Sequence, residues 1–290
     1  MTSSTSSSSS PARAPAGDGR LLGLSRAGVV LLLVLAVANG LWLYVLPARA
    51  ATQYAWPIAP PINAAFLGAG YLAGTVATAL VAFRASQWRS LRVLPVPLVV
   101  LSLAMLAATL IHADRFRWDF PPTWIWTLVY AGVPAGVAVL WGLQERRAAR
   151  PPAPDGRLRA LRGRSLALGL PFCALAVALW VAPTAVAEAW PWPLTPLLAR
   201  ALGGWYALVG AALVCSAVML RRPHEVLIPY VTLGAWTGLL LVLPVLHAGD
   251  LAGRTPALVL WVVAHVLLLL LAVSALRTAL PVVRRRGERL

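Results

Sequence analysis

Long apolar segments recur along the chain and alternate with short polar ones. Eight such segments of about 20 residues are dominated by Leu, Val and Ala, and a helix needs about 20 residues to cross the hydrocarbon core of a bilayer. They lie at roughly 27–46, 62–83, 93–112, 124–143, 166–187, 201–220, 226–247 and 257–280. The pattern predicts an all-α fold, a polytopic transmembrane helical bundle with eight spans.

The composition supports this class of protein. Of 290 residues, 60% are hydrophobic and only 12% are charged, whereas soluble domains carry about 25% charged residues. All 25 basic residues are arginine, and the lack of lysine excludes a P-loop ATPase. The abundance of Ala, Arg and Pro fits a bacterial genome rich in G and C. Cys173 and Cys215 have no CxxC spacing, so neither a disulfide framework nor a cysteine-based zinc site is predicted.

The arginine positions predict the orientation. With the N-terminus inside, 20 of the 25 arginines fall in cytoplasmic segments. Outside are Arg49, Arg115, Arg117, Arg200 and Arg254. This follows the positive-inside rule, so the net charge of +16 requires no nucleic-acid partner. We expect a multi-pass protein of the bacterial plasma membrane, with both termini cytoplasmic and membrane lipid as its surroundings.

An internal repeat divides the chain. The W-P-x-x-P segment that begins at Trp56 recurs at Trp192, an offset of 136 residues. Further matches at offsets of 136 or 135 pair Gly68 with Gly204, Gly74 with Gly210, His112 with His247, and Trp126 with Trp261. Because four helices are an even number, both copies have the same orientation. We therefore predict two parallel four-helix repeats related by an axis along the membrane normal.

The repeat and the polar segments together predict five regions. A Ser-rich N-terminal stretch has almost no apolar content and is expected to be disordered, and an Arg- and Pro-rich linker separates the repeats. The regions are a cytoplasmic tail over 1–22, the first repeat over 23–143, the cytoplasmic linker over 144–165, the second repeat over 166–280 and a basic cytoplasmic tail over 281–290.

Two segments resemble a known group of proteins. One is Trp192-Pro193-Leu194-Thr195-Pro196-Leu197 with Ala199-Arg200, and the other is Asp114-Arg115-Phe116 followed by Trp118. They are similar to an uncharacterised family of bacterial integral membrane proteins with eight helices. The resemblance covers about residues 40–280 and implies the architecture and the plasma-membrane location. It implies no catalytic residue and no cofactor.

Titratable side chains gather at the expected outer ends of the helices. His112, Asp114, Glu188, His247 and Asp250 are suitable ligands for zinc or a similar divalent ion. The alternative is that they are water-facing helix ends whose charges form surface pairs. We keep both interpretations, and we predict no cofactor.

Aromatic residues form the second candidate site. About ten of the thirteen tryptophans fall in the expected outer half, where Trp commonly anchors a protein in the interface. Trp56, Trp126, Trp192 and Trp261 could instead line a ligand cavity. His265 lies four residues after Trp261, so its imidazole can stack on the indole. A neutral histidine that donates one hydrogen bond to a neighbouring carbonyl explains His265 equally well.

Three functions are compatible with these features. We favour a non-enzymatic protein that binds, or facilitates the passage of, a small amphipathic or lipid-like molecule between the two repeats. The helices lack central carboxylates, which argues against an ion-driven pump. The alternatives are a membrane enzyme with an outer-face metal site and a structural or assembly subunit that binds other proteins.

Overall fold

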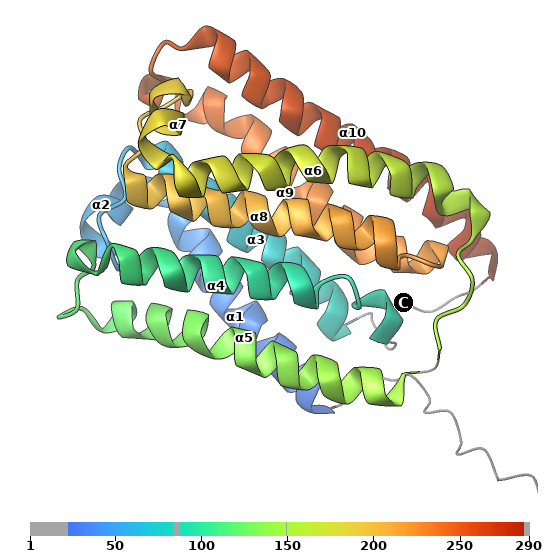
Figure 1. The fold of residues 1–290 in the computed structure, drawn as a ribbon. Coiled ribbons are helices and arrows are strands. Elements are labelled where there is room, and N and C mark those ends of the chain that lie inside the picture. The colour runs from blue at the N-terminus through green and yellow to red at the C-terminus, as the bar shows by residue number, and fades with distance from the viewer. Residues whose placement is uncertain (1–22, 84–87, 149, 287–290) are drawn as a thin grey trace, which may run out of the picture.

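The chain is all-helical over the residues that the structure describes. This computed structural model describes residues 23–83, 88–148 and 150–286, with no strand among them. The long helices are α1 (Gly23–Val45), α3 (Pro61–Phe83), α4 (Pro95–Ile111), α5 (Pro121–Arg147), α6 (Arg159–Val181), α8 (Pro196–Met219), α9 (Leu227–Leu246) and α10 (Thr255–Arg286) (Figure 1). Two short helices, α2 (Ala50–Gln53) and α7 (Pro183–Ala189), lie between them. Each apolar segment of the sequence contains one long helix, but the segment predicted at 166–187 is divided: α6 ends at Val181, and α7 begins at Pro183, where proline cannot continue the preceding helix.

The long helices are those of a multi-pass membrane protein. Within the described ranges, seven of them are long and apolar enough to cross a membrane. The remaining one, α4, is apolar over 17 residues and is shorter than the others. The predicted all-helical membrane architecture is therefore confirmed at this level.

Three helices continue past their apolar segments. α5 ends at Arg147 and α6 begins at Arg159, so parts of the predicted linker 144–165 are helical. α10 extends to Arg286, into the predicted tail 281–290, whose last four residues lie outside the described residues together with the predicted tail 1–22. Arginine and alanine have high helix propensity. A charged residue therefore ends an apolar segment without ending its helix.

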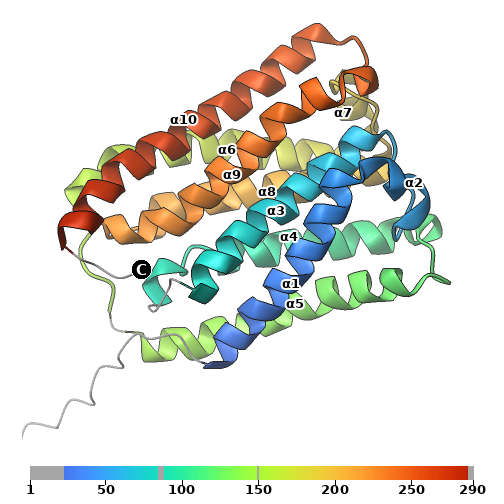
Figure 2. The ribbon, with the colours of Figure 1, turned by 180° about the vertical axis from the view of Figure 1, so that it is seen from behind.

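The long helices pack in two layers. One layer has the order α5, α4, α8, α6, and the other has the order α1, α3, α9, α10. α3 contacts α8 between the layers, and α6 contacts α10 at one edge. α5 and α10 lie at opposite margins of the bundle (Figures 1 and 2). Each layer therefore combines helices from the first and the second half of the chain.

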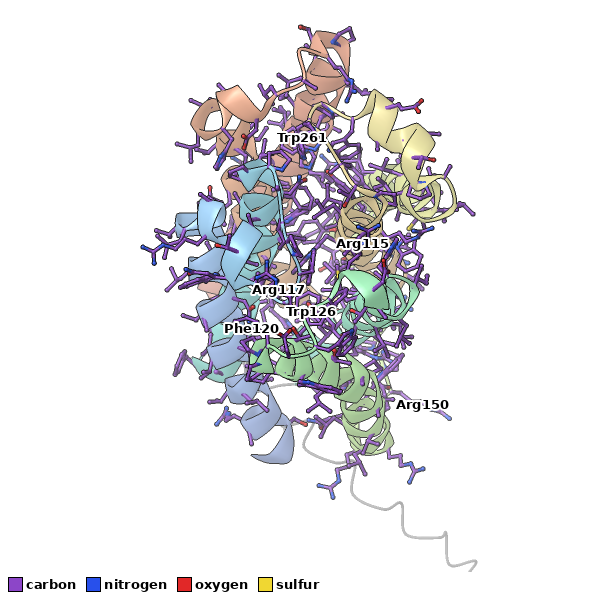
Figure 3. All side chains as sticks on the ribbon, turned by 90° about the vertical axis from the view of Figure 1, so that its left-hand side faces the viewer. Arg115, Arg117, Phe120, Trp126, Arg150 and Trp261 are labelled. Atoms are coloured by element: carbon purple, nitrogen blue, oxygen red, sulfur yellow. The ribbon has the colours of Figure 1, made fainter. Side chains whose placement is uncertain are left out.

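The connections alternate between the two ends of the bundle. One end, which we call the α7 end, holds α2, α7 and the segments 112–120 and 247–254 (Figure 3). Two backbone hydrogen bonds fasten these segments together: Arg117 N–H donates to the Ala55 carbonyl, and Ala252 N–H donates to the Pro191 carbonyl, each at 2.9 Å. The opposite end, where α5 terminates, is called the Glu145 end.

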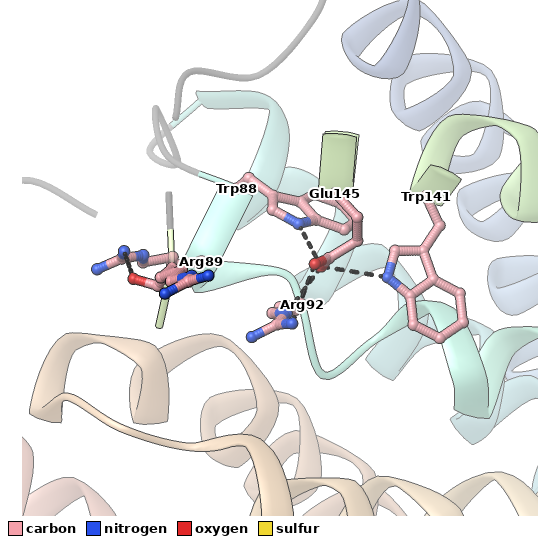
Figure 4. A network of polar contacts seen from close by, with 6 residues as sticks. Trp88, Arg89, Arg92, Trp141 and Glu145 are labelled. Carbon is pink, nitrogen blue, oxygen red and sulfur yellow. Dashed lines mark hydrogen bonds and ion pairs between the residues drawn. The ribbon is translucent and has the colours of Figure 1, made fainter. Parts of the chain in front are cut away.

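Glu145 accepts four hydrogen bonds at the Glu145 end. Glu145 Oε1 accepts hydrogen bonds from Trp88 Nε1 at 2.9 Å, from Arg92 Nε at 2.7 Å and from Trp141 Nε1 at 3.3 Å (Figure 4). Its Oε2 accepts a further bond from Arg92 Nη2 at 3.0 Å. The paired Arg92 and Glu145 side chains are only about 30% exposed, at 29% and 31%. Glu145 therefore ties the end of α5 to the segment that leads into α4.

Removal of this carboxylate should destabilise the bundle. In the Glu145→Ala variant, the buried Trp88 indole N–H and the Arg92 guanidinium lose their acceptor. We expect the free energy of unfolding to fall by about 2 kcal/mol, because unsatisfied buried donors cost about 1–3 kcal/mol. Equilibrium unfolding in mixed micelles measures the difference in the free energy of unfolding between the wild type and the variant. The control is Glu188→Ala, at an exposed position in α7, which should change little. Equal losses in the two variants would contradict the assignment.

Candidate functional site

A cavity lies between the two layers at the edge formed by α1 and α5. Its volume is about 440 Å³, and residues from α1, α3, α4, α5, α8 and α9 line it. The lining is predominantly apolar, and no Asp, Glu, Arg, Lys or His of the described ranges belongs to it. Ligand pockets for small molecules have volumes of about 300–1,000 Å³. The cavity is therefore large enough for one small organic molecule.

Tyrosine hydroxyls are the main polar groups of the cavity. Tyr71 of α3 and Tyr130 of α5 form a hydrogen bond with an oxygen–oxygen distance of 2.5 Å. Tyr54, between α2 and α3, donates to Asn39 Oδ1 of α1 at 3.0 Å. The Trp205 ring packs edge-on against Tyr71, with centroids 5.2 Å apart. These phenols place hydrogen-bonding groups inside a predominantly apolar chamber, whose other polar lining residues include Asn39, Thr78, Ser102, Ser216 and Thr232.

The cavity faces sideways between α1 and α5. The two helices meet near the Glu145 end, where Gln144 Nε2 donates to Ser25 Oγ at 3.4 Å. α1 packs mainly against α3, and α5 mainly against α4. Ile125 of α5 lines the cavity and is 55% exposed, so it marks the mouth. In a membrane, a mouth on this side of the bundle opens onto the lipid chains.

Small side chains create the space on this side. A Cβ atom added to Gly74 of α3 would meet nothing within 4 Å. At an offset of 136 residues, Gly74 corresponds to Gly210 of α8. There, an added Cβ would lie 2.6 Å from Cys173 Sγ. α6 thus packs tightly on α8 at the depth where α1 leaves room beside α3.

Large side chains occupy the corresponding region between α6 and α10. The same offset pairs the cavity residues Ala36 and Gly70 with Phe172 and Tyr206. The Phe172 and Tyr206 rings lie 5.7 Å apart, and His265 packs 6.0 Å from Tyr206. At these two positions, the side of the bundle with the cavity has small residues, and the side between α6 and α10 has aromatic ones.

The four tryptophans singled out in the sequence form two pairs at the α7 end. Trp56 and Trp126 make an edge-to-face contact at 4.7 Å, and Trp192 and Trp261 make another at 5.4 Å. Figure 3 shows Trp126 and Trp261 in different parts of the bundle. All four are buried, and among them only Trp126 lines the cavity. Their burial places them inside the protein and away from its lipid-facing surface.

His265 lies beside the second pair. Its imidazole centroid is 4.0 Å from that of Trp261, and Nδ1 donates to the Trp261 carbonyl at 2.7 Å. Trp261 Nε1 donates in turn to the Tyr206 hydroxyl at 2.9 Å. His265 does not line the cavity. The hydrogen bond to the carbonyl places a hydrogen on Nδ1 and orients the ring.

The residues considered as metal ligands are separated at the α7 end. His247 Nδ1 lies 3.5 Å from Asp250 Oδ2, which also accepts the Ile62 N–H at 2.9 Å. Asp114 is exposed and pairs with Arg115 at 3.0 Å, and Glu188 is exposed in α7. Within the described part of the chain, no three His, Cys, Asp or Glu side chains are grouped so that they could hold a metal ion. Asp250 instead caps the start of α3.

His112 is held by a cation. Its Nε2 lies 2.7 Å from Arg200 Nη1, and a guanidinium can only donate. Partial burial, and then the charge of Arg200, lower the pKa of His112 below its usual value. The imidazole is therefore neutral at pH 7 and accepts this hydrogen bond through Nε2, one of the two nitrogens through which a histidine can bind a metal.

The sequence analysis did not single out the cavity hydroxyls or Asn39. Asn39 and Asn63 are the only asparagines in the chain. Asn63 Oδ1 accepts the Trp192 Nε1–H at 2.9 Å, and its Nδ2 donates to the Pro193 carbonyl at 3.1 Å. A search for amides inside apolar segments would have found both. No comparable signal marks Tyr71 or Tyr130, because tyrosine is common in membrane helices.

The Trp192–Asn63 bond predicts a difference between the two W-P-x-x-P tryptophans. Trp56 Nε1 is buried and has no hydrogen-bond partner among the described residues. Both Trp→Phe variants lose packing, but only Trp192→Phe leaves Asn63 Oδ1 unpaired. We expect Trp192→Phe to lower the free energy of unfolding by about 1–2 kcal/mol more than Trp56→Phe. Unfolding curves of the matched variants measure it, and the reverse order would contradict it.

Comparison with known proteins adds no family or activity to these observations. Scans of protein-family models, of curated proteins and of solved structures each found no match to this chain. Any function must therefore be argued from the cavity and the residues that line it.

Proposed function

We propose that the chain forms eight transmembrane spans arranged as two parallel repeats, with α4 as the shortest span. The bounds of α1 and α6 differ by 136 residues at both ends. The contacts of α1 with α3 and of α3 with α9 recur as contacts of α6 with α8 and of α8 with α4. The Arg117–Ala55 and Ala252–Pro191 hydrogen bonds are related by the same offsets. A helix of 17 residues is at the lower limit for a span.

The arginines give this arrangement its orientation. In our proposal the Glu145 end faces the cytoplasm of a bacterium, and the α7 end faces outward across the plasma membrane. Reporter fusions should place residues 150 and 285 inside and residues 118 and 190 outside, because 20 of 25 arginines then lie on the cytoplasmic side. A reporter at residue 150 that is active only outside would contradict the eight-span arrangement.

The function that we propose is binding of a small amphipathic or lipid-like molecule in the cavity. The observation that carries it is an apolar chamber of about 440 Å³ with a tyrosine pair inside and a mouth between α1 and α5. Lining atoms that face an unfilled apolar space lose their packing contacts. Apolar material from the bilayer that enters through the mouth would restore these contacts, which favours an occupant drawn from the lipid phase.

The lateral mouth distinguishes binding from passage. A channel for a water-soluble solute needs polar openings on both sides of the membrane, whereas this mouth is bordered by Ile125 and other apolar residues of α1 and α5. The geometry therefore favours a molecule that enters from the lipid phase, and the proposed site lies beside the junction of the two repeats.

Filling the cavity should abolish binding. Gly74→Leu adds a side chain where a Cβ meets nothing within 4 Å, so the helix should be retained. We expect an alkyl diazirine probe in nanodiscs to label Tyr71 and Tyr130 in the wild type. In the variant, this labelling should fall at least fivefold, because the leucine occupies the chamber.

Two controls accompany this experiment. Gly136→Leu places the same side chain on an exposed part of α5 with open space around it, and it should leave labelling unchanged. Labelling of Leu270, which is 58% exposed, reports the lipid-facing surface in every variant. If the wild type is labelled only at lipid-facing residues, the cavity takes no ligand and the proposal fails.

A further inference from the structure

The charge of the cavity lining restricts what can bind there. This inference rests on the proposed function and concerns the chemistry of the ligand. The described lining contains no charged side chain, and the six helices that supply it are predominantly apolar. A phosphate or an ammonium group would lose its water without gaining a counter-ion, which is strongly unfavourable. The cavity therefore selects against charged head groups.

The tyrosine pair supplies hydrogen bonds for an uncharged polar group. Each phenol has one hydrogen, and only one of the two can lie between the Tyr71 and Tyr130 oxygens. The pair therefore has one further hydrogen: on Tyr71 it can go to the neighbouring Tyr54 hydroxyl, and on Tyr130 it can go to a ligand. A carbonyl oxygen can accept the remaining hydrogen, and a hydroxyl can both donate and accept. An alkane would form no hydrogen bond with the tyrosine pair.

The depth of the pair limits the shape of the ligand. Tyr130 is nine residues beyond Pro121, the first residue of α5, which corresponds to about 14 Å along a helix. This is close to the middle of a hydrocarbon core about 30 Å thick. Apolar residues of α4 and α8, among them Leu98 and Leu213, continue the chamber toward the Glu145 end. A polar group at the pair would thus have an alkyl chain beside it.

We propose that the ligand is an uncharged, single-chain lipid whose hydroxyl or carbonyl group is held by Tyr71 and Tyr130. The alkyl chain lies along the apolar walls, and the molecule enters between α1 and α5. A phospholipid does not meet these conditions, because its charged head group stays at the membrane surface.

Three probes with the same chain test the class of head group. Purified full-length protein in nanodiscs is loaded with radiolabelled hexadecanol, which is then displaced by unlabelled hexadecanol, hexadecane or hexadecyl phosphate. We expect hexadecanol to compete about fivefold to tenfold better than hexadecane, as one hydrogen bond allows. Hexadecyl phosphate should compete least.

The double variant Tyr71→Phe/Tyr130→Phe tests which residues hold the polar group. It should bind hexadecanol no better than hexadecane, while its affinity for hexadecane stays within about twofold of the wild type. The matched control is Tyr44→Phe. The Tyr44 hydroxyl donates to the Leu239 carbonyl at 3.0 Å and does not line the cavity, so this variant should retain the preference for hexadecanol.

The outcomes separate this inference from the proposed function. If hexadecyl phosphate competes as well as hexadecanol, or if the double variant keeps its preference, the inference on the head group is overturned while binding in the cavity stands. If the Gly74→Leu variant binds hexadecanol as well as the wild type does, binding in the cavity is itself refuted. A thermal melt of each variant identifies any loss that is due to unfolding.

Discussion

Close approach of helix backbones is the constraint on which this bundle depends. Lipid chains are as apolar as leucine, so helices in a membrane gain little from burying apolar surface and associate through tight packing. A Cβ atom on Gly68 would lie 2.5 Å from the Tyr44 backbone nitrogen, and one on Gly210 would lie 2.8 Å from that of Cys173. These two glycines bring α3 against α1 and α8 against α6. The other long helices pack against these two pairs, α4 and α9 directly and α5 and α10 at the margins.

The cavity is a local departure from this packing. Near Gly68, α1 and α3 touch, but at Gly74 the two helices no longer fill the space between the layers. The corresponding region beside α8 is filled by Phe172 and Tyr206. Because both sides have the same helix order, the difference lies in a few side chains. The two sides of the bundle thus share a helix arrangement and differ in whether large side chains fill the space beside it.

Much of the fold could be predicted from the sequence, because membrane helices are encoded locally. Each apolar segment became one long helix, except that proline separates α7 from α6, and otherwise only the ends moved, where arginines extend α5, α6 and α10. The candidate site was less accessible to prediction. The cavity depends on small residues such as Ala36 and Gly74, whose size carries no chemical signal in a chain rich in alanine. Tyr71 of α3 and Tyr130 of α5 come together only when the two layers pack, and the sequence does not show that packing.

The mixing of the two halves within each layer bears on how the chain assembles during synthesis. In the first half, α1 pairs with α3 and α4 pairs with α5, and these two hairpins are joined mainly through α8 and α9. Each hairpin therefore finds its main partner outside its own pair in a helix that comes later in the chain. α8 packs against α4, and α9 packs against α3, so the second half of the chain joins the two hairpins of the first half. The packing of the first half is thus completed only when the second half is present.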